Sequence, residues 1–452
     1  MSAAVTISGT NGTTSVVAIG GASPNILSVT QSVVHVNSVL GSDTNDGLTA
    51  GTALKTWAGF LSRIGYYTLY PGLIDAYIYE DMDPSGLDPL VVNGFYGPGV
   101  GINIHGVTKV LASGTITAVQ ALNTGTDVSC EITAGSFDFS AYVGSLVRIN
   151  TGSPNGPSYC WVRAALTGPV RASVGHVGQR DGSIDGFENV VTPITGQTFD
   201  ILKLPKVYAS YFSEGTPEYG PSWLIEFLAF VTSTNQFAHR VPSAYWLSYE
   251  CSFDAAFVNA TKLTQVANCL FTTSLTVVSN FQNALGLVLN APAAIQMQSG
   301  VWTCYGMTWQ NATMLNDPNT LYGGIFSSHH VSFGLWAFGC TAPVLAGHSS
   351  ASKFIFEAGL YGSGNTSHLI DVSNGGEFTV GSTGKILATT SQNPPLRINN
   401  QTSLPAMDPS TYALTAARTM TVANLEAAVS SGGFGGAIFD PRDQRTRISI
   451  GV

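Results

Sequence analysis

Short runs of alternating apolar and polar residues recur along the whole chain and are separated by turn residues. Four of these runs are SVVHVNS (32–38), DAYIYE (75–80), GINIHGV (101–107) and QTFDILKLP (197–205). A period of two residues is typical of strands that bury one face, and β-branched and aromatic residues favour strands. Lys and Glu, which favour helices, are rare in these runs. The pattern therefore predicts an all-β protein.

Two segments have the pattern of a helix instead. Within residues 56–64, four apolar residues stand at positions i, i+3, i+4 and i+7 and form one helix face: Trp57, Phe60, Leu61 and Ile64. Residues 410–429 are rich in Ala and Leu and are followed by Ser-Ser-Gly-Gly, which is typical of a helix end. We therefore predict a short helix in the first segment and a second helix in the other.

Cysteines recur at regular intervals between residues 206 and 400. Cys251, Cys269, Cys304 and Cys340 are separated by 18, 35 and 36 residues, close to one and two multiples of about 18. Such recurrence is expected where the stacked turns of a solenoid each contribute one inward side chain. The segment would then form roughly ten turns of about 20 residues. A β-sandwich with accidental spacing is the alternative, and the regularity favours the solenoid.

Charge is the unusual feature of the composition. Lys and Arg number 18 and Asp and Glu number 27, so charged residues make up 10% of the chain, where about 25% is usual. Uncharged polar residues must cover the surface, or other subunits must bury part of it. The hydrophobic fraction of 44% excludes disorder for most of the chain. A net charge of −9, with Lys and Arg scattered singly, argues against nucleic acid as a partner.

Segments for membrane insertion or export are not visible in the sequence. No apolar run approaches the about 20 residues of a membrane helix, and the first residues, MSAAVTIS, lack the basic and apolar regions of a secretory signal. We therefore expect assembly in the cytoplasm. The six cysteines form no CxxC pair, so we expect free, buried thiols and neither a metal nor a cofactor.

Residues 34–64 combine a short strand, a polar turn and the expected helix. The strand VHV is followed by the turn GSDTNDG (41–47) and by the step TALKT (52–56). In this order they resemble the first turn of right-handed parallel β-helix proteins, among them tailspike, fibre and decoration proteins of tailed bacteriophages. Residues 76–106 resemble the turns that follow in those proteins, and residues 110–205 resemble a β-rich insertion found in some of them.

The resemblance implies an all-β, right-handed parallel β-helix, which is a solenoid. The expected parts are a short N-terminal arm for assembly contacts (1–33), the first turns with a capping helix (34–109), a β-rich inserted subdomain (110–205), the main β-helix turns (206–400) and a C-terminal cap or clasp outside the coil (401–452).

The resemblance also implies a structural virion protein on the exterior of the particle, engaged in particle architecture and host attachment. The expected partners are further copies of the chain in a homotrimer, other virion proteins and a host-surface glycan. A tailspike-like glycan hydrolase or lyase is the alternative, because the same fold hosts such enzymes. A secreted bacterial adhesin is a third possibility, which the missing signal disfavours.

Carboxylates are the candidate catalytic groups, because glycan hydrolysis needs two of them on one face. Glu250 and Asp254 lie four residues apart, and Asp371 follows an apolar strand start. Nothing in the sequence pairs these three residues, and surface turns also favour acidic residues. Residues 43–47 resemble a calcium loop, but the Gly stands at the fifth rather than the sixth position and no Glu closes the loop. A tight turn is the better interpretation.

The candidates for glycan contact are aromatic residues in consecutive strand-like runs: Trp302, Tyr305, Trp309 and Trp336. Burial inside the coil or between subunits explains the same residues, and burial inside the coil is the favoured interpretation. His329 and His330 form the one adjacent histidine pair. Neighbours in a strand point to opposite faces, so these two residues are not expected to bind one metal ion together.

Overall fold

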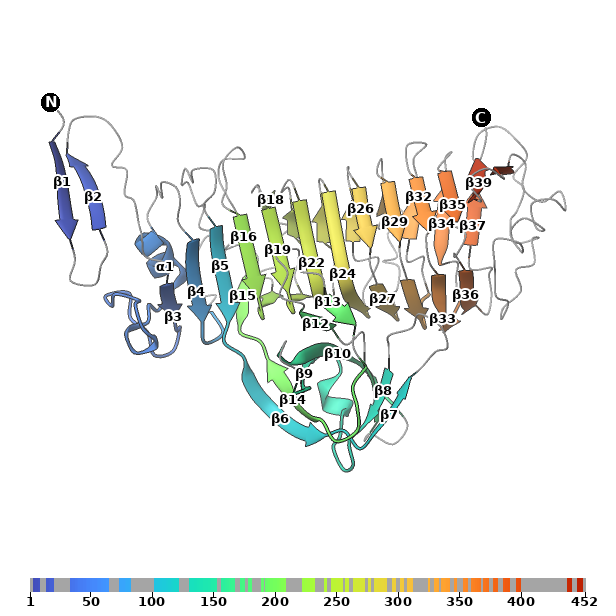
Figure 1. The fold of residues 1–452 in the computed structure, drawn as a ribbon, viewed down its shortest axis with the longest axis horizontal. Coiled ribbons are helices and arrows are strands. Elements are labelled where there is room, and N and C mark those ends of the chain that lie inside the picture. Colours follow the sequence, from blue (N-terminus) through green and yellow to red (C-terminus); the bar gives the residue numbers. More distant parts are fainter. Residues whose placement is uncertain are drawn as a thin grey trace. The chain divides into compact units, whose positions relative to one another are not determined.

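The computed structural model shows an all-β chain (Figure 1). The residues it describes are 3–8, 14–19, 33–64, 73–82, 101–121, 130–152, 156–166, 171–174, 178–180, 188–190, 192–208, 222–231, 240–399 with internal gaps, 437–440 and 445–449. The all-β prediction is confirmed, and the helix expected over residues 56–64 is α1 (Trp57–Ile64). The helix predicted over residues 410–429 lies outside the described residues.

The chain divides into two compact units. Unit 1 contains residues 1–109 and 203–265, and unit 2 contains residues 110–202 and 266–452. Unit 1 begins with an antiparallel hairpin formed by β1 (Ala3–Ser8) and β2 (Thr14–Ile19).

The rest of unit 1 is built from three ladders of parallel strands (Figure 1). The first contains β3 (Val33–Val36), β4 (Leu73–Ile78), β5 (Gly101–Gly106), β16 (Ser222–Glu226) and β19 (Tyr245–Tyr249). The second contains β15 (Lys206–Tyr208), β17 (Ala229–Val231) and β20 (Ser252–Asp254), and the third contains β18 (Arg240–Val241) and β21 (Phe257–Asn259). β16, β17 and β18 each pair with the third strand after them, so this repeat adds one strand to each ladder.

Alternate residues of the first ladder are buried, as the period of two in the sequence predicts. The parallel register brings equivalent positions together, so Val34, Ala76, Ile104 and Ile225 form one buried level. Burying each large aliphatic side chain contributes about 1.5–3 kcal/mol relative to leaving it in water. The residues between them face outward and are free to be polar.

Unit 2 repeats this arrangement. One ladder contains β24 (Asn280–Leu289), β26 (Val301–Cys304), β29 (His329–Ser332), β32 (Lys353–Phe356) and β35 (Glu377–Val380). A second joins the other end of β24 to β27 (Met307–Gln310), β30 (Leu335–Phe338), β33 (Gly359–Asn365) and β36 (Lys385–Thr390). The third contains β23 (Leu275–Val277), β25 (Ile295–Met297), β28 (Gly324–Ile325), β31 (Leu345–Gly347), β34 (Ile370–Ser373) and β37 (Leu396–Asn399).

Three further strands belong to the sheets described so far. β22 (Leu263–Phe271) contains the boundary between them. In unit 2, β38 (Ala437–Asp440) and β39 (Arg445–Ser449) form an antiparallel hairpin. β39 also pairs antiparallel with β35, so the hairpin extends a parallel ladder with a strand of opposite direction.

Residues with positive φ, which is the left-handed region of backbone conformation, recur among the parallel strands of both units. We call these positions corners. The residues with positive φ at these corners are Phe227 and Glu250 in unit 1, and Asn268, Asn290, Asn311, Gly339 and Gly364 in unit 2. Gly and Asn adopt this conformation more easily than other residues. In unit 2 successive corners are 21 to 28 residues apart, so the repeat is longer and less regular than the sequence suggested. Asn311 Nδ2 donates to Asn290 Oδ1 at 3.1 Å and links two of the corners.

Three cysteines directly follow these corners. Cys251, Cys269 and Cys340 are buried free thiols, and each sulfur lies 3.3–3.6 Å from the carbonyl oxygen two residues earlier. The expectation of free, buried thiols is confirmed for these residues. Cys304 instead ends β26 at the register of Asn283 and Ser332. The inference that all four cysteines form one ladder was therefore wrong, because repeats of unequal length can produce nearly regular spacings by accident.

The inserted segment forms an antiparallel sheet in unit 2. Its strands are β6 (Lys109–Thr115), β7 (Ala118–Ala121), β8 (Cys130–Thr133), β9 (Leu146–Asn150), β10 (Ser158–Ala165), β11 (Arg171–Val174), β12 (Gly178–Arg180), β13 (Glu188–Val190) and β14 (Thr198–Lys203). The main pairing order is β6-β14-β9-β10-β11-β8-β7. Because two residues separate β6 from β7, this order returns to its start and closes a small barrel around Ile116, Ile132, Ala134, Phe139, Val147, Ile149, Cys160, Val162, Phe199 and Ile201.

The barrel contacts the corners of the parallel strands within unit 2. Trp161 Nε1 donates to the carbonyl oxygen of Asn268 at 2.7 Å, and Asn268 Nδ2 donates to the carbonyl oxygen of Tyr159 at 2.9 Å. The guanidinium carbon of Arg163 lies 3.9 Å from the centroid of the Phe338 ring. These contacts hold β10 against a corner and a strand end.

Side-chain hydrogen bonds hold the polar turn before α1. Asp43 accepts from the backbone N–H groups of Lys55 and Thr56 at 2.9 Å, and from the Thr56 hydroxyl at 2.7 Å. Thr56 Oγ1 accepts from the N–H of Gly59 and thereby caps α1. Burial acts to raise the pKa of Asp43, but these hydrogen bonds and the charge of Lys55 lower the pKa overall. Residues 43–47 are therefore a tight turn, as predicted.

We expect Asp43→Ala to lower the free energy of unfolding by about 1–2 kcal/mol, because it removes three hydrogen bonds at the start of α1. Since the folded-state pKa lies below the ordinary value of 3.8, this contribution is present above that value and is lost as the pH falls through the folded-state pKa. Denaturant unfolding at neutral and acidic pH measures both effects. Asp46→Ala, which removes the hydrogen bond that Asp46 accepts from the Leu48 N–H, is the control; equal losses in the two variants would contradict the account.

Candidate functional site

Four outward-facing side chains lie at the same register on four neighbouring strands of unit 1. His35 on β3 pairs with Tyr77 on β4, Tyr77 with His105 on β5, and His105 with Glu226 on β16. All four are partly exposed, whereas the residues on either side of them in β3, β4 and β5 are buried. We call this set the outward row.

The aromatic rings of the outward row are stacked on one another. The ring centroids of His35 and Tyr77 are 5.3 Å apart with an interplanar angle of 18°, and those of Tyr77 and His105 are 5.1 Å apart with an angle of 28°. The spacing follows from the distance of about 4.8 Å between paired strands. Rings from both neighbouring strands therefore stack on Tyr77, whose side chain remains partly exposed.

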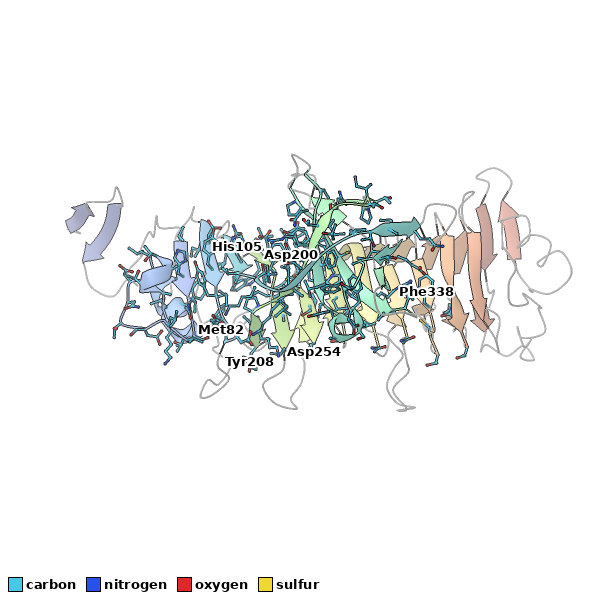
Figure 2. The ribbon with its side chains drawn as sticks, turned by 90° about the horizontal axis from the view of Figure 1, so that it is seen from below. Met82, His105, Asp200, Tyr208, Asp254 and Phe338 are labelled. Carbon is cyan, nitrogen blue, oxygen red and sulfur yellow. The ribbon has the colours of Figure 1, made fainter. Side chains whose placement is uncertain are left out.

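Polar groups surround the row. His105 Nδ1 lies 2.7 Å from Glu226 Oε2, and His105 Nε2 lies 3.4 Å from Asp75 Oδ1. Asn103 Nδ2 donates to the same Asp75 oxygen at 2.7 Å. The side chains of His105, Asp75 and Glu226 are 22%, 27% and 14% exposed, so all three are accessible at the surface. Figure 2 marks His105 among the side chains of this unit.

The two histidines of the row have pKa values shifted in opposite directions. The hydrogen bond with Glu226 raises the pKa of His105, burial opposes this, and the charges of Glu226 and Asp75 add to the increase. Burial lowers the pKa of His35, whose Nδ1 lies 2.9 Å from the Tyr79 hydroxyl. Burial also raises the pKa of Tyr79, with a smaller contribution from Tyr77. One row therefore combines a histidine that favours its charged form with one that favours its neutral form.

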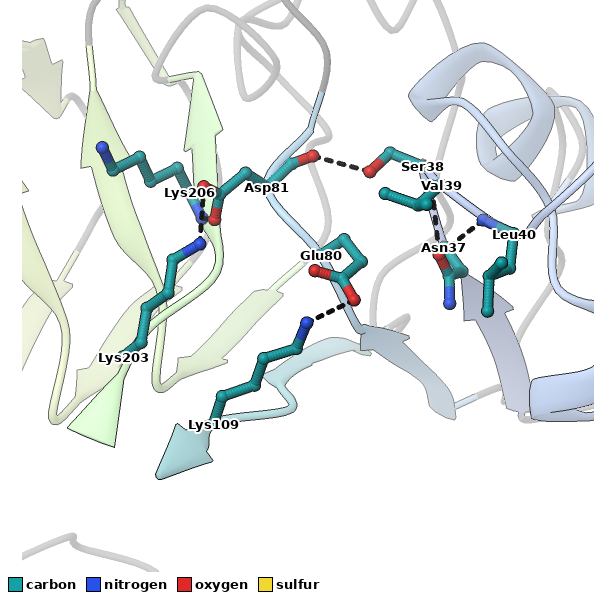
Figure 3. A network of polar contacts seen from close by, with 9 residues as sticks. All are labelled: Asn37, Ser38, Val39, Leu40, Glu80, Asp81, Lys109, Lys203 and Lys206. Carbon is teal, nitrogen blue, oxygen red and sulfur yellow. Dashed lines mark hydrogen bonds and ion pairs between the residues drawn. The ribbon is translucent and has the colours of Figure 1, made fainter. Parts of the chain in front are cut away.

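A second polar cluster binds both ends of the inserted segment (Figure 3). Lys109, at the start of β6, is ion-paired with Glu80, and Lys203, at the end of β14, lies 2.9 Å from Asp81. The backbone N–H of Lys206 also donates to Asp81 at 3.1 Å. Exposed ion pairs of this kind each contribute at most about 1 kcal/mol, so the cluster fixes geometry more than it adds stability.

The carboxylates proposed from the sequence do not form one accessible group in unit 1. Glu250 is fully buried at a left-handed corner with φ 47°, whereas Asp254 is exposed at the end of β20. A glycan cannot reach a buried carboxylate without a change in structure. Asp371 lies in β34, paired in register with Ala346 and Arg397, and its side chain is outside the described residues. Catalytic roles for Asp254 and Asp371 stay predictions.

The tryptophans proposed for glycan contact lie on strands of unit 2. Trp302 is in β26, Trp309 in β27 and Trp336 in β30, and the register pairs Trp336 with Thr308 rather than with another tryptophan. Their side chains are outside the described residues, as is the whole of Tyr305. Their role in glycan contact stays a prediction.

Three of the four strands that form the outward row were predicted from the sequence, but the row itself was not. VHV, AYIY and NIHG contain His35, Tyr77 and His105, and a His or Tyr at an outward position of a strand is the available signal. The juxtaposition of His105 and Glu226 bridges 121 positions of sequence, across an insertion whose effect on register no local pattern reveals.

The residues that the structure describes contain neither a metal site nor a membrane-spanning helix. They include no group of three or more His, Cys, Asp or Glu side chains placed to hold a metal ion. None of the described helices has the length and apolarity needed to cross a membrane.

The sequence matches no protein-family model and no curated protein. Among solved structures, it is similar to the Gp54 tailspike of the Acinetobacter baumannii bacteriophage AP22, whose structure is a complex with A. baumannii capsular saccharide. The two chains are 10% identical over 73% of this chain and 67% of the tailspike chain, with a TM-score of 0.19. A likeness at this level establishes neither fold nor function.

We expect Tyr77→Ala to lower the free energy of unfolding by about 1–3 kcal/mol, because it removes two ring contacts from the outward row. Tyr77→Phe keeps both contacts, and its free energy of unfolding is expected to lie within about 0.5 kcal/mol of that of the wild type. Denaturant unfolding of the two variants measures the difference. Equal stability of the Ala and Phe variants would mean that the stacking does not support the strands.

Proposed function

We propose that the chain is a structural protein of a tailed-phage particle, folded as a right-handed parallel β-helix and displayed on the exterior as a homotrimeric spike, fibre or decoration protein. The coil is supported by the recurrent pairing of a strand with the third strand after it, and by the recurring left-handed corners. The turn 41–47, the step 52–56 and α1 stand at the start of this coil, as in the phage proteins that the sequence resembles.

A homotrimer is supported by the scarcity of charge. Charged residues make up 10% of the chain, which leaves long uncharged flanks on a coil of this size. Contact with sister subunits removes such flanks from water and protects strand edges from unwanted pairing.

Native mass spectrometry of the purified protein is expected to give three times the mass of one chain at micromolar concentration. The trimer should persist at 1 M salt, because the burial of uncharged surface is not screened. Sedimentation at several concentrations provides an independent measurement. A monomer that stays dispersed under these conditions would overturn the trimer.

Host attachment is assigned to the outward row, and this row is the observation that carries the functional proposal. The row and the adjacent side chains of Asp75 and Asn103 present phenol, imidazole, carboxylate and amide groups along neighbouring strands about 4.8 Å apart. A glycan carries hydroxyl groups at close intervals, each of which can donate and accept hydrogen bonds. The hydroxyl of the partly exposed Tyr77 and the Asp75 carboxylate suit such a ligand, since the hydroxyl can donate and the carboxylate accepts.

We expect Tyr77→Phe and Asp75→Asn each to weaken retention on host-surface polysaccharide about 3–10-fold, the cost of one lost or weakened hydrogen bond. Capsular polysaccharide and lipopolysaccharide from candidate hosts, immobilised on a sensor surface, are the probes. Tyr208→Phe is the matched control, because Tyr208 is a partly exposed tyrosine on β15 of the same unit (Figure 2). Retention that the first two variants leave unchanged would remove the row from the proposal, and release of reducing ends by the wild type would favour the alternative, a glycan hydrolase or lyase.

A further inference from the structure

His105 lies between carboxylates from two different strands. Glu226 on β16 approaches Nδ1 at 2.7 Å, and Asp75 on β4 approaches Nε2 at 3.4 Å, while His105 itself belongs to β5. One side chain therefore connects three neighbouring strands of the first ladder.

The number of protons on the imidazole ring decides how many of these contacts are favourable. A neutral imidazole has one N–H donor and one lone pair, whereas an imidazolium has two donors. Ionised carboxylates only accept hydrogen bonds. Neutral His105 can therefore satisfy one carboxylate, and its lone pair then faces the other. Protonated His105 satisfies both.

The groups that face His105 all favour the protonated form or are neutral. β4 contributes Asp75 and the ring of Tyr77, and β16 contributes Glu226. Asn103 donates to Asp75 from the same strand as His105. On the far side of Glu226, the register partner is the buried residue Tyr249 on β19.

We propose that His105 is a proton-dependent latch of the outward row, which holds both Asp75 and Glu226 when charged and releases Asp75 when neutral. Glu226 is the partner retained, because its contact is the shorter one. Where the latch concerns glycan contact, it rests on the proposed function. Release of Asp75 then frees an acceptor for a ligand hydroxyl at higher pH, at the expense of the link between β4 and β5.

The latch lies between two strands of the first ladder that the inserted segment separates along the chain. β5 precedes the inserted segment and β16 follows it, so the link between His105 and Glu226 spans 121 positions. Two further ion pairs lie at this place, Glu80 with Lys109 and Asp81 with Lys203. His105 adds a histidine to them, and histidine is the residue type whose charge changes near neutral pH.

The direction of the response follows from the raised pKa of His105. The stabilisation is fully present below the ordinary value of 6.5 and is lost as the pH rises through the folded-state pKa. His35, whose pKa is lowered, has the opposite sign, because its stabilisation is present above 6.5 and is lost as the pH falls through its folded-state value. The two histidines of one row therefore serve as internal controls for each other.

Hydrogen exchange of the intact protein, measured by mass spectrometry between pH 5.5 and 8 and corrected for intrinsic exchange rates, tests the latch. In the wild type, protection of β4, β5 and β16 is expected to be roughly tenfold higher at pH 5.5 than at pH 8. His105→Gln should abolish this dependence, and His35→Gln should retain it. A dependence that survives in His105→Gln, or is absent from the wild type, would overturn the latch.

Asp75→Asn provides a second variant if His105→Gln does not fold. An Asn amide can donate to neutral Nε2, so the pH dependence should shrink while the protein stays folded; an undiminished dependence would count against the latch. Retention on the polysaccharide used above should rise between pH 5.5 and pH 8 in the wild type and stay constant in His105→Gln. Absence of retention at every pH would refute the proposed function alone, because hydrogen exchange judges the latch independently.

Discussion

Register between parallel strands is the constraint on which the other features of unit 1 depend. Parallel pairing places each residue beside its equivalent on the next strand, about 4.8 Å away, so one choice of register decides both faces at once. On the buried face it stacks Val34, Ala76, Ile104 and Ile225, and it places the rings of Phe230 and Phe253 4.9 Å apart at 4°. On the outer face the same register creates the outward row. A slip of one residue would exchange the two faces.

The parallel register also limits how many charged residues the outer face can carry. A residue type repeated at equivalent positions of successive strands places like charges about 5 Å apart, which destabilises the pair. The outward row avoids this by placing His105 between Asp75 and Glu226, with the Tyr77 ring beyond and then His35, whose lowered pKa favours its neutral form. A charged fraction of 10% is thus consistent with stacking as well as with burial between subunits.

Local patterns in the sequence were sufficient for the elements that depend on neighbours in the chain. The strand alternation, α1 and the tight turn at residues 43–47 were predicted because their hydrogen bonds or burial patterns are set within about 15 residues. The outward row was not, because it depends on register between β5 and β16. The buried, free thiols of Cys251, Cys269 and Cys340 were predicted, but a ladder of all four cysteines was not correct, because repeats of 21 to 28 residues in unit 2 put Cys304 in a strand instead of after a corner. Side-chain chemistry at a site assembled by register cannot be identified before the register is known.

The pairing of β5 with β16, which we call the joint, is the strand pairing in unit 1 that costs the most conformational entropy to form. Closing a chain segment costs conformational entropy that increases with its length, although slowly, and this joint closes over more than 100 residues while later turns close over about 20. Side-chain contacts that act only in the correct register are therefore most valuable here. His105 bonds Glu226 across this joint, and Glu80 and Asp81 bind the two ends of the inserted segment beside it. These polar contacts lie where the backbone ladder alone specifies the register least, so side-chain charge adds specificity at the place where the backbone provides the least.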